Sequence, residues 1–406
     1  MLGPWTRKVY STQNSDNTQI LKEILKYCRE NNIPSIFWNK EDPVAQIDSK
    51  YNFIDIALEF DYIFTTDDES VENYKRKGHN NVFSLMFASQ PKLFNPINLK
   101  NRKKDAVVFA GSWYSKYPER CKTMSLIFDK VLDKNLDLKI YDRFLKKIKN
   151  KAFPEKYQQY VTEGVDYLEI PKIYKEYEFA INLNTVTDSN TMFAKRVFEL
   201  MASNTIVLSN YSKGVYKFFK NNVLYLDKDD YDLNQNFDKI KEENLYNVLE
   251  NHSCSNRFRQ ILDAINFKYV PDLKHIVLFY KLDDLKDLSK ILNHFHSIDY
   301  PYKRLKLITC ENNLFLHDAI LESDLNNLLF KNNYYFCFAD LSLNPDFVKK
   351  ALLHFQYIDD NVGISQNNEN KYCFGKTDDI RNTIFNNQLY DDVVSQKNND
   401  WDIYHI

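Results

Sequence analysis

Short apolar segments alternate with amphipathic helical segments along most of this 406-residue sequence. Residues 33–38, 62–65 and 82–87 are predicted strands. A predicted helix at 18–29, with apolar side chains three and four positions apart, precedes the first of them. Strands that alternate with helices favour parallel sheets covered by helices. The sequence therefore predicts an α/β fold.

Two polar stretches divide the sequence into three predicted units. Residues 98–105 separate a first unit, 1–104, from a second unit, 105–270, which opens with the apolar run AVVFAG. Residues 271–273 mark the start of a third α/β unit, 271–406. Its predicted strands lie at 275–280, 305–309 and 334–339, and its predicted helices at 285–296 and 344–355.

Composition and charge exclude several classes of protein. A hydrophobic content of 44% is enough for a buried core, and the net charge of −2 argues against a general nucleic-acid binder. The basic runs at 102–104 and 146–151 are interpreted as solvated surface. The six cysteines are scattered, without the spacing of a zinc site or a disulfide scaffold. We therefore expect a reduced, cytoplasmic protein whose membrane contact is at most peripheral, and a homo-oligomer is left open.

The segment 182–214 combines features of a phosphate-binding loop. It is interpreted as a polar loop, a helix at 193–202, a strand at 205–209 and a turn at Gly214. Ligands of open α/β sheets lie beyond the carboxyl ends of the strands, near helix N-termini. The helix is expected to open near Met192, after the cap-forming residues Asp188, Ser189, Asn190 and Thr191.

Three charged residues in this helix suit a nucleotide sugar. Lys195 and Arg196 would meet phosphate in the first turns, and Glu199 would accept hydrogen bonds from the hydroxyls of a ribose or sugar. The alternative is an ordinary capped helix with a Glu–Arg pair on its surface.

The run VFELMASNT at 197–205 resembles the F-E-x-x-A-x-G-x-x signature of group 1 glycosyltransferases with the GT-B fold. Further runs, which begin at Phe64, Val107, Ile140, Phe153 and Ile181, resemble the CgeB-like, spore-maturation-protein type of these enzymes. These ordered motifs cover roughly residues 5–265. The resemblance implies two Rossmann-like lobes facing a cleft, with a UDP-type nucleotide sugar bound by the C-terminal lobe and with neither a cofactor nor a bound metal.

The resemblance also assigns site residues. Glu199 matches the carboxylate that holds the ribose, and Arg196 and Lys195 lie where a diphosphate would be met. The remaining donor-binding positions lie at strand ends of the same lobe: Gly111, Ser112, Tyr114, Tyr141, Asp142, Arg143, Asn182, Asn184, Asp188 and Thr191. The sequence departs from the family at Thr191, where many members carry a second glutamate, and at Asn204, which replaces a glycine.

The N-terminal lobe is expected to be shortened at its start relative to a full GT-B lobe. Its candidates for acid–base catalysis are Asp42 and Glu41, because they follow a predicted strand end and an inverting transfer needs a group that takes the acceptor proton. The alternative is a polar turn closed by Pro43. Asp67 and Asp68 are predicted to cap a helix.

The third unit resembles something different. Its opening strand–helix–strand is similar to family 2, GT-A type glycosyltransferases, and the run from Phe336 is similar to the region of their D-x-D motif. Here that motif is Asp340-Leu341-Ser342, so the second metal-binding carboxylate is missing. The unit is expected to be a degenerate GT-A-like module for packing, dimer contact or acceptor binding, or a plain α/β appendage.

Together these patterns predict a metal-independent glycosyltransferase. It would move a sugar from a nucleotide-diphosphate donor to a glycan, a cell-surface polymer or a protein. The alternative is a non-catalytic protein that retains the fold and binds a nucleotide sugar or glycan, or acts as a scaffold. A nucleic-acid partner is not expected, because the sequence lacks a basic stripe interleaved with aromatic residues.

Overall fold

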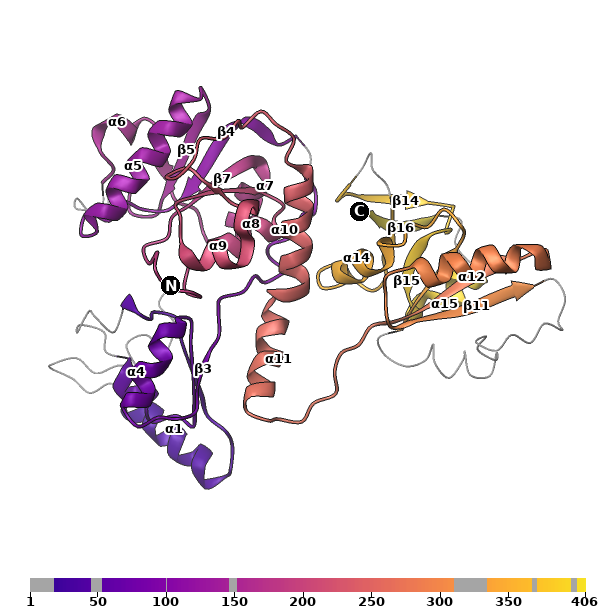
Figure 1. Ribbon diagram of the computed structural model, residues 1–406, viewed down its shortest axis with the longest axis horizontal. Helices are drawn as coiled ribbons and strands as arrows, with labels where there is room; N and C mark the ends of the chain where they lie inside the picture. The colour runs from indigo at the N-terminus through magenta and orange to yellow at the C-terminus, as the bar shows by residue number, and fades with distance from the viewer. Residues whose placement is uncertain are drawn as a thin grey trace. The chain divides into compact units, whose positions relative to one another are not determined.

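The computed structural model describes residues 18–44, 53–99, 101–145, 152–309, 334–366, 371–395 and 400–406. The chain divides into two compact units, one of residues 1–94 and 102–268 and the other of residues 95–101 and 269–406 (Figure 1). The stretch 95–101, which the sequence analysis placed in the first lobe, therefore groups with the second unit. One reason is a backbone hydrogen bond of 2.8 Å from Asn98 N–H to the carbonyl of Tyr372.

The N-terminal lobe of the first unit is built on a three-stranded parallel sheet in the order β1-β2-β3. Its strands are β1 (Ile36–Asn39), β2 (Tyr62–Thr65) and β3 (Val82–Ser84), and its helices are α1 (Gln19–Glu30), α3 (Ile54–Ala57) and α4 (Val71–Arg76). The first strand begins later than residue 33. Both Ser35 N–H and Ser35 Oγ donate to Asp61 Oδ2, at 2.8 and 2.7 Å, and so hold the chain in a loop before the strand.

The C-terminal lobe of the same unit is built on a six-stranded, all-parallel sheet in the order β6-β5-β4-β7-β8-β9. Its strands are β4 (Lys103–Ala110), β5 (Asp137–Asp142), β6 (Val161–Glu163), β7 (Tyr177–Asn182), β8 (Ile206–Ser209) and β9 (Leu224–Tyr225). Its helices are α5 (Pro118–Asp133), α6 (Glu155–Gln158), α7 (Ile170–Glu176), α8 (Arg196–Ala202), α9 (Lys213–Phe219), α10 (Asp238–Asn251) and α11 (Cys254–Ala264).

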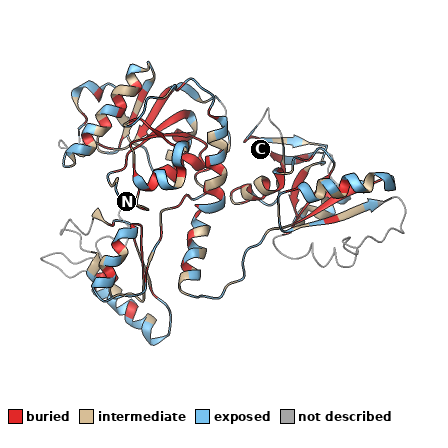
Figure 2. Cartoon of the chain, viewed as in Figure 1, coloured by how far each residue is buried: buried red, intermediate tan, exposed pale blue. Residues whose placement is uncertain are grey.

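Helices cover both faces of this sheet, so its inner strands are buried on both sides (Figure 2). Every residue of β7 is buried. Along β4, Val108 packs into a cluster with α8 residues such as Phe198, whereas Val107 packs into a second cluster with α5 residues such as Phe128. The two clusters explain why the strands were recognisable as continuous apolar runs.

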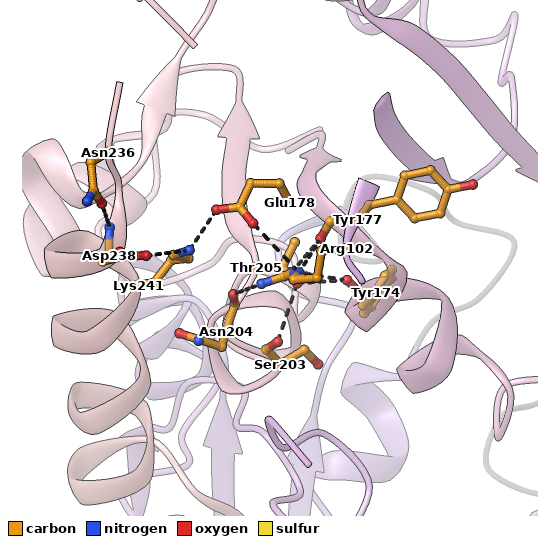
Figure 3. Close-up of polar contacts among 10 residues, drawn as sticks. All are labelled: Arg102, Tyr174, Tyr177, Glu178, Ser203, Asn204, Thr205, Asn236, Asp238 and Lys241. Atoms are coloured by element: carbon orange, nitrogen blue, oxygen red, sulfur yellow. Dashed lines mark hydrogen bonds and ion pairs between the residues drawn. The ribbon is translucent and has the colours of Figure 1, made fainter. Parts of the chain in front are cut away.

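A buried polar network joins the amino ends of the strands (Figure 3). Arg102 Nε donates to the carbonyl of Tyr177 at 3.1 Å, and Arg102 Nη1 donates to the carbonyl of Asn204 at 2.5 Å. Glu178 forms ion pairs with Arg102 at 3.8 Å and with Lys241 at 2.7 Å. The prediction that the run 102–104 is solvated is therefore wrong for Arg102, whose side chain is only 7% exposed because carbonyl groups surround it.

The helix α11 connects the two lobes of the first unit. Its capping residue Ser253 pairs with Ser89 in an isolated β-bridge, and Arg257 Nε donates to the carbonyls of Met86 and Phe87, at 2.9 and 3.0 Å. Farther along the helix, Ile261 packs in a cluster with N-lobe residues. The contacts bring the last helix of the C-terminal lobe against the N-terminal lobe.

The second unit contains a seven-stranded mixed sheet in the order β11-β10-β12-β15-β13-β16-β14. Its strands are β10 (His275–Leu282), β11 (Lys303–Thr309), β12 (Tyr334–Ala339), β13 (Gly363–Ser365), β14 (Phe374–Thr377), β15 (Thr383–Asn386) and β16 (Trp401–His405). Its helices are α12 (Leu288–Ser297), α14 (Phe347–His354) and α15 (Tyr390–Val394). The predicted α/β class, with two parallel-sheet lobes and a third α/β module, is confirmed.

The likeness of this unit to GT-A enzymes stays a prediction. Asp340, the remaining carboxylate of the altered motif, accepts hydrogen bonds from Ser342 N–H at 2.8 Å and from Asn382 Nδ2 at 2.9 Å.

In the described part of the chain, no helix combines the length and apolar character needed to cross a bilayer.

Candidate functional site

The loop after β7 forms direct hydrogen bonds with the N-terminal lobe. Thr191 Oγ1 accepts the N–H of Asp68 at 2.8 Å and donates to the carbonyl of Thr66 at 2.9 Å. The Glu69 carboxylate accepts the N–H of Asn190 at 3.1 Å and the hydroxyl of Ser189 at 3.0 Å. The Thr191 side chain therefore joins the two lobes of the first unit.

The predicted start of the next helix is wrong. The helix α8 begins at Arg196, four residues after Met192, and its N-cap Lys195 makes no side-chain capping bond. The intervening backbone is held by other side chains. Asn184 Oδ1 accepts the N–H of Ala194 at 2.9 Å, and Ser189 Oγ accepts the N–H of Met192 at 3.0 Å. The polar residues before the helix therefore anchor a loop instead of capping the helix.

Glu199 is buried and already paired. It is 5% exposed, its carboxylate forms an ion pair with Lys195 at 2.7 Å, and the Tyr167 hydroxyl donates to it at 2.9 Å. Lys195 Nζ also donates to the Tyr167 hydroxyl at 2.7 Å. Burial opposes the positive charge of Lys195, but the Glu199 carboxylate outweighs it and raises the pKa of Lys195. The alternative, a Glu–Arg pair on the helix surface, is wrong, because Glu199 is buried and pairs with Lys195.

Two guanidinium groups lie close together beyond the end of β4. Arg196 Nε donates to the Tyr174 hydroxyl at 3.2 Å and a second nitrogen donates to the carbonyl of Ala110. Arg120, in the first turn of α5, donates to the carbonyl of Ser112 at 3.3 Å. Burial and the positive charge of Arg196 lower the pKa of Arg120. Within the described ranges neither guanidinium forms an ion pair with a carboxylate, so the pair can accept an anion.

The predicted residues at the ends of β4 and β5 contact one another. Ser112 Oγ donates to Asp142 Oδ1 at 2.6 Å, and the N–H of Gly111 donates to the carbonyl of Tyr141 at 3.0 Å. Arg143 donates to the Tyr114 hydroxyl at 2.8 Å. Because Asp142 is 1% exposed, its carboxylate fixes this edge instead of facing a ligand.

The predicted residues at the end of β7 also form an internal network. Asn182 and Asn184 are 0% and 3% exposed. Asn182 Nδ2 and Asn184 Nδ2 both donate to Ser209 Oγ, at 3.1 and 3.3 Å, and the N–H of Asn184 donates to Asn210 Oδ1 at 2.8 Å. These amides align β7 with β8 and thereby position the loop that follows.

The two acid–base candidates have different environments. Asp42 is 0% exposed and accepts hydrogen bonds from Asn39 Nδ2 at 2.9 Å, Thr65 Oγ1 at 2.8 Å and the Tyr74 hydroxyl at 3.0 Å. Glu41 is exposed, but desolvation by nearby protein atoms and the charge of Asp42 raise the pKa of Glu41. A fully enclosed carboxylate cannot reach a substrate proton, so Glu41 is the candidate base and Asp42 a buried support.

Two adjoining cavities lie between the lobes. The larger, of about 860 Å³, is called the chamber here, and it is lined by Pro43, Val44, Asp67, Glu69, Ser70, Asn73, Lys116, Tyr117, Thr185, Val186, Thr187, Asp188 and Ser189. The smaller, of about 340 Å³, is called the cationic pocket, and it is lined by Glu41, Val44, Tyr114, Lys116, Tyr117, Arg120, Leu183, Thr185, Val186, Met192, Phe193 and Ala194. Lys116 and Tyr117 line both, so the two cavities adjoin.

Of the predicted site residues, Glu41 and Tyr114 line the cationic pocket and Asp188 lines the chamber. Sequence reasoning missed Lys116, Arg120 and Glu69. The signal for the first two was present in the run SWYSKYPER, because a loop after the first strand of a parallel sheet faces the ligand edge. In the described part of the chain no group of three or more His, Cys, Asp or Glu side chains could hold a metal ion. Metal independence stays a prediction.

Residues 125–263 match the family model described as glycosyl transferase-like. The matched stretch includes β5 to β9 and all of the loop that carries Thr191. No curated protein is significantly similar to the sequence. A glycosyltransferase-like region therefore makes up most of the C-terminal lobe.

Among solved structures, a variant of TarM from S. aureus in complex with fondaparinux, α-GlcNAc-glycerol and UDP is 14% identical, with a TM-score of 0.37 over 53% of this chain and 45% of that one. HepE from Anabaena with UDP and glucose is 11% identical, with a TM-score of 0.42 over 62% and 76%. A glycosyltransferase from Rickettsia africae is 16% identical, with a TM-score of 0.42 over 63% and 82%. The chain thus spans less than half the length of the TarM chain it matches.

Proposed function

We propose that this protein is a glycosyltransferase that takes a sugar from a nucleoside-diphosphate donor, UDP-type, and passes it to a glycan, cell-surface polymer or protein. The observation that carries the proposal is the pair of unneutralised guanidiniums, Arg120 and Arg196, beside the cationic pocket and the chamber. The chamber is lined mainly by hydroxyl, amide and carboxylate side chains. The glycosyl transferase-like family match over this lobe supports it.

The cationic pocket would hold the diphosphate of the donor. Arg120 and Lys116 line it, and guanidinium and ammonium groups would neutralise the charge that develops on the leaving phosphate. This is why we propose a metal-independent reaction. Glu199 would take the ribose hydroxyls, which would then replace the Tyr167 hydroxyl that the carboxylate now accepts.

The chamber would hold the transferred sugar and the acceptor. In a single displacement, the acceptor hydroxyl oxygen attacks the anomeric carbon while the bond from that carbon to the diphosphate oxygen breaks. The acceptor proton passes to Glu41, which lines the adjoining cationic pocket close to Val44, a residue that lines both cavities. The raised pKa of Glu41 makes it a stronger base than an ordinary glutamate. Asp42 supports the turn through its three buried hydrogen-bond donors. The motif order favours the CgeB-like branch within this class.

A non-catalytic binding protein is the second candidate, and one observation favours it. Thr191 replaces the glutamate found in many family members and is used for hydrogen bonds between the lobes. Such a protein would bind the donor without transferring its sugar.

The test is calorimetric titration with UDP and a panel of UDP-, GDP-, dTDP- and CMP-sugars, followed by detection of the free nucleotide released from the bound donor. We expect one donor class to bind, and Arg120→Ala to weaken its binding at least tenfold. The matched control Arg381→Ala, which removes an exposed arginine of the second unit, should bind as the wild type does. Binding without any nucleotide release, with acceptors present, would favour the binding protein. No binding of any nucleotide would refute both.

A further inference from the structure

A cluster of tyrosines lies next to the chamber on the C-terminal lobe. The ring centroids of Tyr211 and Tyr216 are 5.8 Å apart, those of Tyr211 and Tyr225 are 5.6 Å apart, and those of Tyr216 and Tyr225 are 6.1 Å apart. We call these three residues the tyrosine platform. They follow β8, lie in α9 and end β9, so the platform stands at the carboxyl edge of the sheet.

The platform has an exposed part and a buried part. Tyr216 is 45% exposed and Tyr211 is half-buried, whereas Tyr225 is 4% exposed and packs in the main core cluster. Two contacts fix the position of Tyr211. Its N–H donates to Asp227 Oδ1 at 2.7 Å, and the ammonium of Lys228 lies 5.5 Å from its ring centroid. The rings thus form a supported aromatic surface and not a loose side-chain group.

The buried hydroxyl of Tyr225 has no hydrogen-bond partner in the part of the chain that the structure describes. Its electrostatic neighbours are the phenols of Tyr231, Tyr211 and Tyr216 and the carboxylate of Asp227. Because protein atoms enclose this hydroxyl, a ligand on the surface does not reach it. Tyr225 contributes its ring, on which Tyr211 and Tyr216 pack. A ligand with an apolar face would cover the exposed parts of the Tyr211 and Tyr216 rings.

The platform is connected directly to the chamber. The N–H of Lys213, between Tyr211 and Tyr216, donates to the carbonyl of the chamber residue Thr187 at 2.8 Å. Asn210, just before Tyr211, accepts the N–H of Asn184 at 2.8 Å, next to the chamber residue Thr185. The chain segment that carries Tyr211 and Tyr216 therefore lies against the chamber wall formed by Thr185 and Thr187.

We propose that the tyrosine platform is a subsite for further sugar units of an oligosaccharide acceptor whose reacting end lies in the chamber. Pyranose rings have an apolar C–H face and a polar rim, and tyrosine offers an aromatic face with a hydroxyl at its edge. The acceptor class is then a glycan of several units, not a single sugar or a lipid. This inference rests on the proposed function for the identity of the reacting end, but binding to the platform does not require catalysis.

Binding is tested by native electrophoresis of the full chain in gels that contain glycol chitin, mixed-linkage β-glucan or dextran. We expect at least one polymer to retard the wild type. Tyr216→Ala should reduce this retardation at least five-fold, and Tyr216→Phe should keep most of it. Tyr225→Phe removes only the enclosed hydroxyl and keeps the supporting ring, so it should leave the retardation unchanged. Tyr27→Ala changes an exposed tyrosine on α1, 61% exposed against 45% for Tyr216, and as the control it should behave as wild type.

Several outcomes would overturn the proposal. They are a wild type that no polymer retards, a Tyr216→Ala variant retarded as strongly as the wild type, and an equal loss in Tyr27→Ala. Nucleotide release in the absence of acceptor, measured on the same variants, separates this failure from that of the proposed function. If polymer binding depends on Tyr216 but neither the wild type nor any variant releases nucleotide, the enzyme is refuted and the glycan-binding site remains. If Tyr216→Ala matches the wild type both in nucleotide release and in polymer binding, the platform is refuted and the proposed function is not.

Discussion

The hydroxyl of Thr191 accepts the backbone N–H of Asp68 at 2.8 Å, and this bond joins the loop after β7 to the N-terminal lobe. The same oxygen donates to the carbonyl of Thr66 at 2.9 Å, so one side chain satisfies a donor and an acceptor on the opposite lobe. Both walls of the chamber depend on this contact, because Asp67 and Asp188 lie on either side of it.

Thr191→Val preserves the shape of the side chain but removes its hydroxyl. We expect it to lower the free energy of unfolding of the first unit by about 1–3 kcal/mol. The reason is that Thr191 is 8% exposed and the Asp68 N–H and the Thr66 carbonyl lose their partner. Urea denaturation measures it. The control is Thr123→Val, because the Thr123 hydroxyl donates to the carbonyl of Glu119 in its own helix at 3.0 Å. An equal effect of the two substitutions would contradict the role of Thr191.

Removing the charge of Glu178 should strongly destabilise the C-terminal lobe. Glu178→Gln leaves the buried Arg102 without its carboxylate and weakens the ion pair with Lys241, and breaking such a buried pair costs about 3 kcal/mol or more. Thermal and denaturant unfolding report the loss. Asp379→Asn breaks the exposed pair with Arg381 and should change stability little. A Glu178→Gln protein as stable as the wild type would show that carbonyl groups alone suffice to hold Arg102.

The stability of the first unit should fall in acid because of His252. Burial and the charge of Arg257 lower the pKa of His252 from 6.5 to about 3. Between these values the unfolded chain binds more protons than the folded one, so the free energy of unfolding decreases as the pH falls, by at most about 1.4 kcal/mol per pH unit.

His252→Gln tests this, because glutamine can still accept the hydrogen bond from Arg257 but does not titrate. Urea midpoints between pH 7 and pH 4 should depend less on pH in this variant. His354 retains its own slope, since burial also lowers its pKa to about 3. The exposed His296→Gln should leave the dependence unchanged, and an unchanged dependence in His252→Gln would show that His252 titrates normally.

Glu41 and Asp42 should separate into a catalytic and a structural residue. Glu41→Gln should reduce the rate of sugar transfer by at least a hundredfold without a change in unfolding, whereas Asp42→Asn should lower stability because three buried donors lose a charged acceptor. The acid limb of the rate profile should lie above the ordinary glutamate pKa of about 4.5, because the pKa of Glu41 is raised. A transfer rate unaffected by Glu41→Gln would remove the base assignment.

The sequence was sufficient to predict the features that depend on residues near one another in the chain. The strands β2 and β12 were predicted at their observed bounds, because a run of apolar side chains next to turn residues reports a buried strand directly. The order of the three α/β units follows from the same alternation. Lys195 and Glu199 were recognised as a charged set, since four residues separate neighbours on one face of a helix.

The sequence was insufficient where the partners are distant in the chain. The start of α8 was misplaced because Asn184 and Ser189 anchor the preceding residues, and such bonds are invisible to a local pattern. Arg102 was taken for surface because its carbonyl partners come from residues 70 or more positions away. Asp42 and Glu41 are neighbours of the same chemistry, and only packing against Thr65 and Tyr74 made one of them inaccessible.

The sequence alone thus determined the α/β class and the lobe with the glycosyltransferase-like motif, because apolar periodicity and short motifs are local properties of the chain. Only the tertiary structure decided which polar groups face the cavities. It placed Arg120, Lys116 and Glu69 there, it assigned Asn182, Asn184 and Asp142 to internal hydrogen bonds, and it turned Thr191 into a bond between the lobes. The reason is physical: whether a polar side chain binds a ligand or its own fold depends on which partners the rest of the chain brings within about 3 Å.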